Sequence, residues 1–184
     1  MLANPNAMAF YPTQIFFHLL PFQTAFELHY VLHCVFSGIA VFLLGLTLGL
    51  HPHAAFFSAM LFNFSGATLS LVNLANILPI VTYLPLLTWV LLKNLQRFSL
   101  IRIAGASLLF GFFFLLLEPV SILAVALFLI PTAIGFYGLN SGPKVPLCQA
   151  IGIFVLIGAS GFFLAAVQFA PTWELIENSG RKWG

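Results

Sequence analysis

The residues that could perform chemistry are few, because this 184-residue chain carries six Lys or Arg, four Glu and no Asp. Glu118 is the clearest candidate, since it stands between Leu115-Leu116-Leu117 and Pro119 in an otherwise apolar stretch. Ionisable side chains set in such stretches commonly mark functional sites. A glutamate directly before a proline is also an ordinary way to start a helix. A structural and a functional role for Glu118 therefore both stay open.

Two histidines form a second cluster. His29 and His33 are four residues apart, so in a helix both imidazoles lie on one face. Such a pair can hold a metal ion only with a third ligand, and Glu27 does not share that face. We therefore predict no metal site. We expect His33 to turn into the protein and to hydrogen-bond a neighbouring group or a polar ligand.

Two asparagines and one arginine are further polar candidates. Asn73 and Asn76 precede Leu78-Pro79, where they either line an outward-facing cavity or satisfy the backbone of a loop. Arg181 follows the short motif PTWE at 171–174, and a guanidinium is a natural partner for a phosphate. The sequence contains no glycine-rich phosphate loop and no Ser-His-Asp set, so it predicts no cofactor.

The composition is that of a membrane protein. Hydrophobic residues make up 61% of the chain and charged residues 5%, against roughly a quarter charged in soluble domains. The mean hydropathy is +1.09. The net charge of +2 is small and dispersed, so the predicted partner is the lipid bilayer, and no nucleic-acid partner is expected.

Apolar windows between helix breakers predict an all-α, polytopic integral membrane helix bundle of about six transmembrane helices. The third and fourth spans are short, so each could be a tilted or partly re-entrant helix. The predicted spans are Tyr30–Leu50, Ala54–Val72, Ile77–Leu92, Leu100–Leu117, Pro119–Tyr137 and Leu147–Phe169. Small residues at Gly45, Gly49, Gly158, Ser160 and Gly161 predict close approaches between helices.

The basic residues predict the orientation, because cytoplasmic connections carry the excess of Lys and Arg. Four of the six lie between spans three and four or between spans five and six, whereas all four glutamates fall on the opposite side. Arg181 and Lys182 depart from this pattern, but they follow the last span. Both termini are thus expected on the outer face. The chain divides into an outer interfacial segment (1–29), the transmembrane bundle (30–169) and an outer tail (170–184), in which Trp173 is expected to anchor at the interface.

The order of several short motifs resembles the YfhO-type bacterial membrane proteins, which are related to the GT-C class of polytopic glycosyltransferases. The motifs are Tyr11-Pro12, Leu32-His33 leading to Gly38 and Leu43-Leu44-Gly45, Asn63-Phe64-Ser65-Gly66, Asn73 and Asn76, Leu84-Pro85-Leu86, and Pro171-x-x-Glu174-Leu175 with Ser179-Gly180-Arg181. The resemblance covers most of the chain. It implies a multi-pass protein of the bacterial cytoplasmic membrane that transfers sugar from a polyprenyl-phosphate donor to a cell-envelope glycopolymer.

The acidic loop that such enzymes use for catalysis has no counterpart here, so the chain is expected to be an internal fragment that is inactive alone or completed by another membrane chain. No catalytic residue is transferred. The candidates for lining the donor cavity are Glu118, His33, Arg181, Asn73, Asn76 and Tyr11. Two alternatives stay open, namely a non-enzymatic membrane scaffold or subunit and a small transporter-like module.

Overall fold

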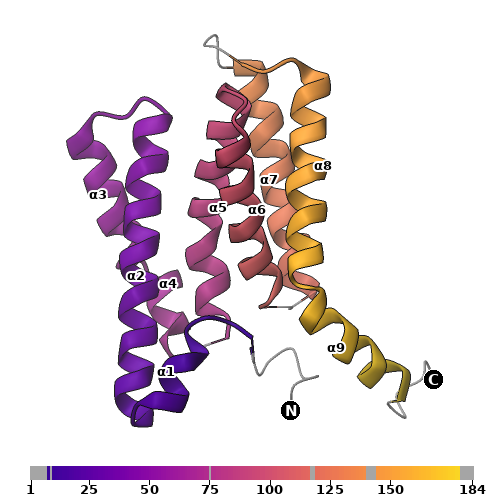
Figure 1. The fold of residues 1–184 in the computed structure, drawn as a ribbon. Helices are drawn as coiled ribbons and strands as arrows, with labels where there is room; N and C mark the ends of the chain where they lie inside the picture. The colour runs from indigo at the N-terminus through magenta and orange to yellow at the C-terminus, as the bar shows by residue number, and fades with distance from the viewer. Residues whose placement is uncertain (1–7, 9, 75, 117–118, 140–143, 179–184) are drawn as a thin grey trace.

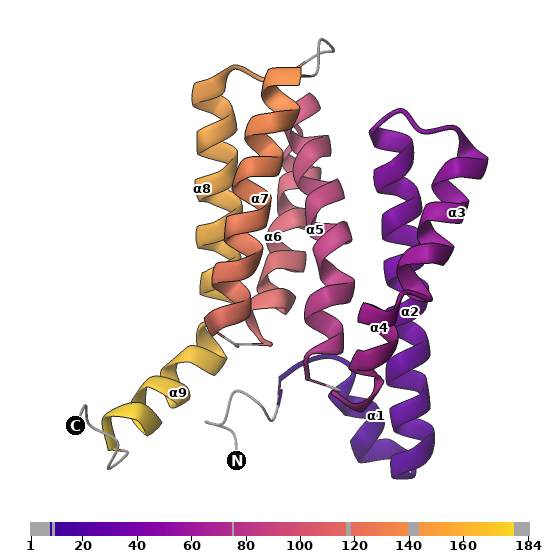
Figure 2. The same ribbon diagram turned by 180° about the vertical axis from the view of Figure 1, so that it is seen from behind.

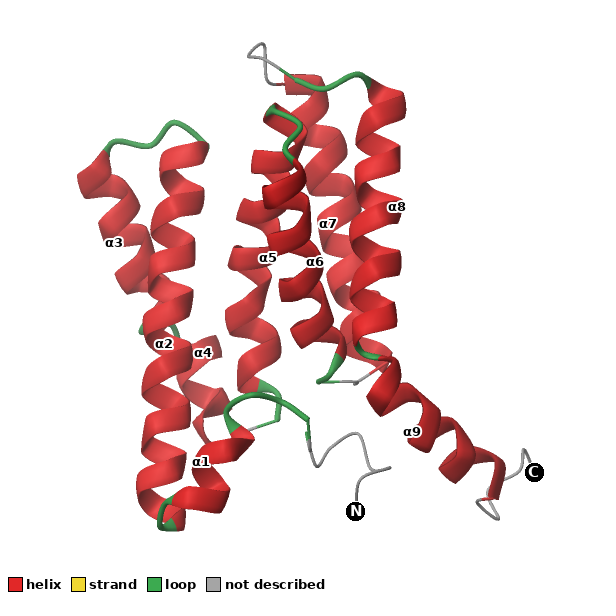
Figure 3. Cartoon of the chain, viewed as in Figure 1, coloured by secondary structure: helices red, strands yellow, loops and turns green. Residues whose placement is uncertain are grey.

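The computed structural model describes residues 8, 10–74, 76–116, 119–139 and 144–178, and all regular structure within them is helical. Figures 1 and 3 show the helices running mostly side by side, with α9 turned away from the bundle. The start of α1 and the end of α9 lie toward the same end of the molecule (Figure 1). The helices are α1 (Gln14–Leu19), α2 (Phe22–Thr47), α3 (Pro52–Asn63), α4 (Gly66–Ser70), α5 (Leu78–Gln96), α6 (Leu100–Phe114), α7 (Pro119–Leu139), α8 (Leu147–Leu164) and α9 (Ala166–Asn178), with a 3-10 turn at Leu71–Asn73.

Among the described residues, three helices are long and apolar enough to cross a membrane, namely α2, α5 and α8. The apolar stretches Leu100–Phe114 in α6 and Val125–Gly138 in α7 are shorter. At 1.5 Å rise per residue, the 19 residues of α5 reach about 28 Å, close to the thickness of a hydrocarbon core. The structure therefore supports a helical membrane protein with three full-length spans among the described residues, and the number of six stays a prediction.

The second predicted span, Ala54–Val72, is not one helix. Helix α3 ends at Asn63, and Ser65 starts α4 by accepting a hydrogen bond from the backbone N–H of Thr68 at 3.2 Å. A serine in this capping position satisfies a free N–H of a new helix, so it favours a break over continuation. Composition alone hid this break, because both pieces are apolar.

The boundaries of the outer spans also differ from expectation. Helix α2 begins at Phe22, directly after Pro21, so it includes residues that were expected in the interfacial segment. The last predicted span divides after Leu164, and α9 runs from Ala166 with Pro171 inside it. The tail motif PTWE therefore lies within α9.

Helix α5 is the centre of the bundle. It contacts α2, α6, α7 and α8. In its most apolar stretch 67% is buried inside the protein, whereas the corresponding share is 22% in α2 and in α8. Figure 2 shows α2 and α3 on one side of α5, and α6, α7 and α8 on the other. Because α5 is enclosed on several sides, it holds the two parts of the molecule together.

Small residues allow α6 and α8 to approach closely. A Cβ atom added at Gly161 would lie 2.8 Å from Cβ of Phe110, closer than packed carbon atoms come. The hydroxyl of Ser160 donates to Ser107 across the same contact at 2.6 Å. The close packing predicted at Ser160 and Gly161 is present, whereas a Cβ at Gly158 would meet nothing within 4 Å.

Charged residues separate between the two ends of the molecule. The connection between α5 and α6 and the connection before α8 lie at one end, which we call the basic end; it carries Lys93, Arg97, Arg102 and Lys144. Helix α1, the start of α2 with Glu27, and α9 with Glu174 and Glu177 lie at the other, the acidic end (Figure 1). This separation is what a sequence following the positive-inside rule gives when it folds into alternating helices.

Candidate binding site

A polar cluster lies at the acidic end, where the segment before α1 folds over α2. Tyr11 belongs to this segment, and its side chain is only 3% exposed. His29 and His33 project from α2 toward it, and both are buried. The four-residue spacing of the histidines places their ring centroids 4.3 Å apart on one face of the helix, as the sequence predicted.

Hydrogen bonds connect these side chains into one network. The Nδ1 atom of His33 lies 2.6 Å from the carbonyl oxygen of His29, and since a carbonyl only accepts, Nδ1 carries the proton. In the neutral ring Nε2 is then the acceptor, and it receives the hydroxyl of Tyr11 at 2.7 Å. Thr13 joins the network through a 2.8 Å hydrogen bond between Oγ1 and Nδ1 of His29.

A cavity of about 300 Å³ adjoins the network. Polar groups of Tyr11, Thr13, His33, Thr82 and Tyr83 contribute to its lining. The rest of the lining is apolar and consists of Pro12, Phe36, Leu86, Leu109 and Phe112, so the cavity lies between the N-terminal segment, α2, α5 and α6. Its volume is at the small end of the range for ligand sites, about 300–1,000 Å³, which fits one small headgroup.

The described lining of this cavity is polar without being charged. No Lys, Arg, Asp or Glu is among the described residues that line it. Burial raises the pKa of the Tyr11 hydroxyl, and the neighbouring Tyr83 raises it further, so Tyr11 remains a hydrogen-bond donor at neutral pH. Hydroxyl and imidazole groups of this kind suit a neutral ligand rich in hydroxyl groups.

A second polar contact fixes α3 against α2 one turn beyond His33. The amide of Asn63 donates to the carbonyl of Cys34 at 2.9 Å and accepts from the hydroxyl of Ser37 at 2.5 Å. A Cβ at Gly38 would lie 2.8 Å from Nδ2 of Asn63, so a small residue is needed there. These bonds hold the wall of the site that carries His33.

The structure brings together two of the six predicted site residues, Tyr11 and His33. Asn73 is exposed and Asn76 is half-buried, and neither lines this cavity. Glu118 and Arg181 lie outside the described residues. The prediction missed Thr13 and Tyr83, because no spacing in the sequence brings the N-terminal segment and α5 to the same place.

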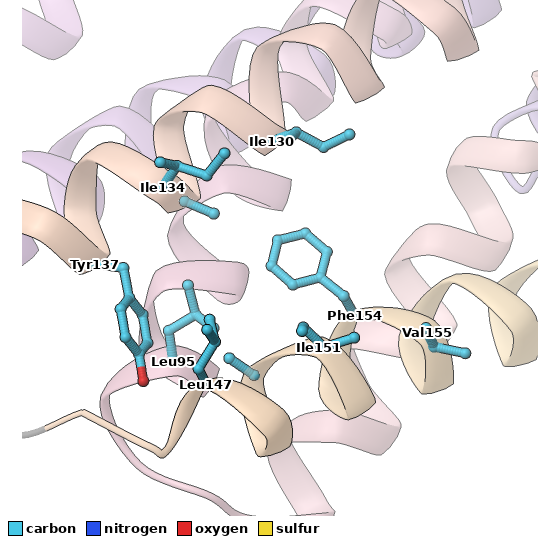
Figure 4. Close-up of a pocket in the computed structure, with 10 residues that line it drawn as sticks. Leu95, Ile130, Ile134, Tyr137, Leu147, Ile151, Phe154 and Val155 are labelled. Carbon is cyan, nitrogen blue, oxygen red and sulfur yellow. The ribbon is translucent and has the colours of Figure 1, made fainter.

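A separate cavity of about 330 Å³ lies between α7 and α8 near the basic end (Figure 4). Its lining is apolar apart from Tyr137, whose hydroxyl donates to the carbonyl of Val145. It contains no group for chemistry. Within the described residues, no group of three His, Cys, Asp or Glu is placed to hold a metal ion.

No family model, no curated protein and no solved structure matches this chain. The functional conclusion therefore rests on the geometry described above and on the motifs of the sequence.

Proposed function

We propose that this chain is a multi-pass protein of the bacterial cytoplasmic membrane whose cavity beside Tyr11 binds the sugar of a polyprenyl-phosphate donor. The basic end then faces the cytoplasm and the acidic end faces outward, so the cavity opens at the outer side. In this proposal the chain supplies the donor-binding part of a GT-C-like glycosyltransferase. The carboxylate needed for transfer comes from outside the described residues or from a complementing membrane chain.

The observation that carries the proposal is the pairing of neutral hydrogen-bonding groups and apolar side chains around one cavity. A lipid-linked sugar also combines a polar and an apolar part, since its hydroxyl groups need donors and acceptors while its hydrocarbon stays in the bilayer. Tyr11, Thr13 and Tyr83 supply hydroxyl groups, and Phe36 and Leu86 supply apolar surface. The hydrogen bond from Tyr11 fixes the His33 ring, which reduces the cost of ordering the site when a ligand binds.

Binding of a polyprenyl-phosphate hexose to the full chain in lipid nanodiscs tests this proposal, with unglycosylated polyprenyl phosphate as the reference ligand. We expect the hexose-bearing lipid to bind more tightly. Thr13→Val should weaken that binding by about 2- to 10-fold, the worth of one hydrogen bond.

Thr132→Val is the matched control, because Thr132 lies on α7 away from this cavity and donates to the carbonyl of Phe128. It should leave binding unchanged. Equal affinity for the two lipids, or equal effects of the two threonine variants, would contradict a sugar site at this cavity.

A further inference from the structure

A second polar cleft, of about 480 Å³, lies between α5 and α6 at the basic end. The chemistry in its lining comes from Lys93 and Asn94 in the last turns of α5, Arg102 in the first turn of α6, and Trp89 one turn below Lys93. The rest of the lining is apolar or glycine. This cleft and the cavity beside Tyr11 lie toward opposite ends of α5 and α6 and share Leu109, and among the described lining residues only the cleft has cations.

The cations of the cleft have donors left over. Arg102 uses one bond, from Nη1 to the carbonyl of Lys93 at 3.2 Å, which caps the C-terminal end of α5. A guanidinium has five N–H donors, so most of them remain available. Within the described residues, no carboxylate pairs with Arg102 or with the ammonium of Lys93. Two uncompensated cations at one cleft attract an anion.

Asn94 supplies a complementary group in the lining of the cleft. Its side chain is fully buried, and its Nδ2 atom donates to the carbonyl of Val90 at 2.9 Å. Its Oδ1 atom has no hydrogen-bond partner among the described residues. A buried acceptor without a donor is uncommon in folded proteins. A ligand that brings a hydroxyl group to this oxygen would satisfy it, which a fully ionised anion cannot do.

Exposed apolar side chains directly precede Arg102 at the start of α6. Ile101, which lines the cleft, is 86% exposed, and Leu100 before it is 70% exposed. Exposed aliphatic side chains beside basic residues at the end of a membrane helix match the boundary between headgroups and acyl chains, where tryptophan also concentrates. A ligand held here therefore has hydrocarbon alongside it as well as a charged group inside the cleft.

We propose that this cleft binds one anionic phospholipid whose headgroup carries hydroxyl groups, from the leaflet at the basic end. Lys93 and Arg102 contact the phosphate, a headgroup hydroxyl donates to Oδ1 of Asn94, and the acyl chains lie along Ile101 and Leu100. Basic sites between membrane helices are known to select anionic headgroups in this way. The lipid would hold α6 against α5 where the two helices are joined by a short connection.

Lipid titration of the full chain followed by native mass spectrometry tests this proposal. The probes are phosphatidylglycerol, phosphatidic acid, which lacks the headgroup hydroxyls, and phosphatidylcholine, which has no net charge. We expect a first, saturable phosphatidylglycerol to bind more tightly than either of the others. Lys93→Gln and Arg102→Gln should each weaken it by about 5-fold, the effect of one cation near a membrane surface.

Arg97→Gln is the matched control, because Arg97 is exposed at the same end, carries the same charge and does not line the cleft. It should change affinity by less than 2-fold, as expected for a charge screened by solvent. Equal losses in all three variants would show non-specific attraction to the basic surface and overturn the site. No loss in any of them, or displacement of the lipid by millimolar inorganic phosphate, would overturn it as well.

Asn94→Leu tests the contribution of the hydroxyl contact independently of the two cations. It should remove the preference for phosphatidylglycerol over phosphatidic acid while leaving the preference for both over phosphatidylcholine. Helix content measured by circular dichroism shows whether this variant folds. A folded Asn94→Leu protein that still prefers phosphatidylglycerol would overturn the assignment of the headgroup.

Discussion

Removing the hydroxyl group of Tyr11 tests whether its bond to His33 holds the N-terminal segment on the bundle. Tyr11→Phe keeps the ring and its packing but leaves Nε2 of His33 without a donor. A flip of the His33 ring would not restore a partner, since Nδ1 already donates to the carbonyl of His29 at 2.6 Å and that bond would be lost. His33 is 2% exposed, so water does not replace the lost partner.

The magnitude follows from this burial. A buried polar atom that loses its partner costs about 1–3 kcal/mol, whereas replacing both partners by apolar groups costs much less. We therefore expect Tyr11→Phe and His33→Leu each to destabilise the protein, and the double variant to lose less than the sum. The coupling free energy should be at least about 1 kcal/mol, because the two atoms are 2.7 Å apart.

Equilibrium unfolding of the four proteins in mixed detergent micelles measures the coupling. Limited proteolysis of the segment before α1 provides a second readout, since loss of this bond releases that segment before the bundle unfolds. Additive effects within about 0.5 kcal/mol would refute the reasoning, because residues without mutual contact behave in that way.

Three further predictions concern packing, pH and orientation. Gly161→Ala should destabilise the α6–α8 contact by about 1–3 kcal/mol in unfolding experiments, whereas Gly158→Ala, with no atom within 4 Å, should not destabilise it. Because folding raises the pKa of Tyr11, its stabilisation is present below about pH 10 and is lost as the pH rises further; Tyr11→Phe should flatten that loss between pH 9 and 11. In a cysteine-free background, Lys144→Cys and Glu174→Cys should react with an impermeant thiol reagent from opposite sides of the membrane, and labelling from the same side would contradict the orientation.

The helical membrane architecture could be predicted from composition, because a chain with so few charges has only apolar helices to build from. Helix boundaries were harder. Inside one apolar stretch, α3 ends at Asn63 and Ser65 caps the start of α4 through the backbone N–H of Thr68. The cap is local, but hydropathy does not register it, and the bond from Asn63 to Cys34 depends in addition on a partner helix.

The candidate site, like the fold, could be predicted from the sequence only in part. The four-residue spacing of His29 and His33 in the sequence fixes their common face, because every α-helix has the same period. Their hydrogen-bond partners, Tyr11 and Thr13, come from the N-terminal segment, and Tyr83 of α5 packs against the Tyr11 ring. The packing of the N-terminal segment, α2 and α5 brings those groups to one cavity, and no spacing along the chain predicts it.

By itself the sequence determined that the protein is helical, that its surface suits lipid, and that basic and acidic residues fall at alternate connections. These properties are local, because each depends on residue type and on helix period. Tertiary structure decided which helix became the buried centre, which polar side chains found partners, and that Asn94 Oδ1 was left without one. Such outcomes depend on how whole faces of helices fit together, which is a property of many side chains at once.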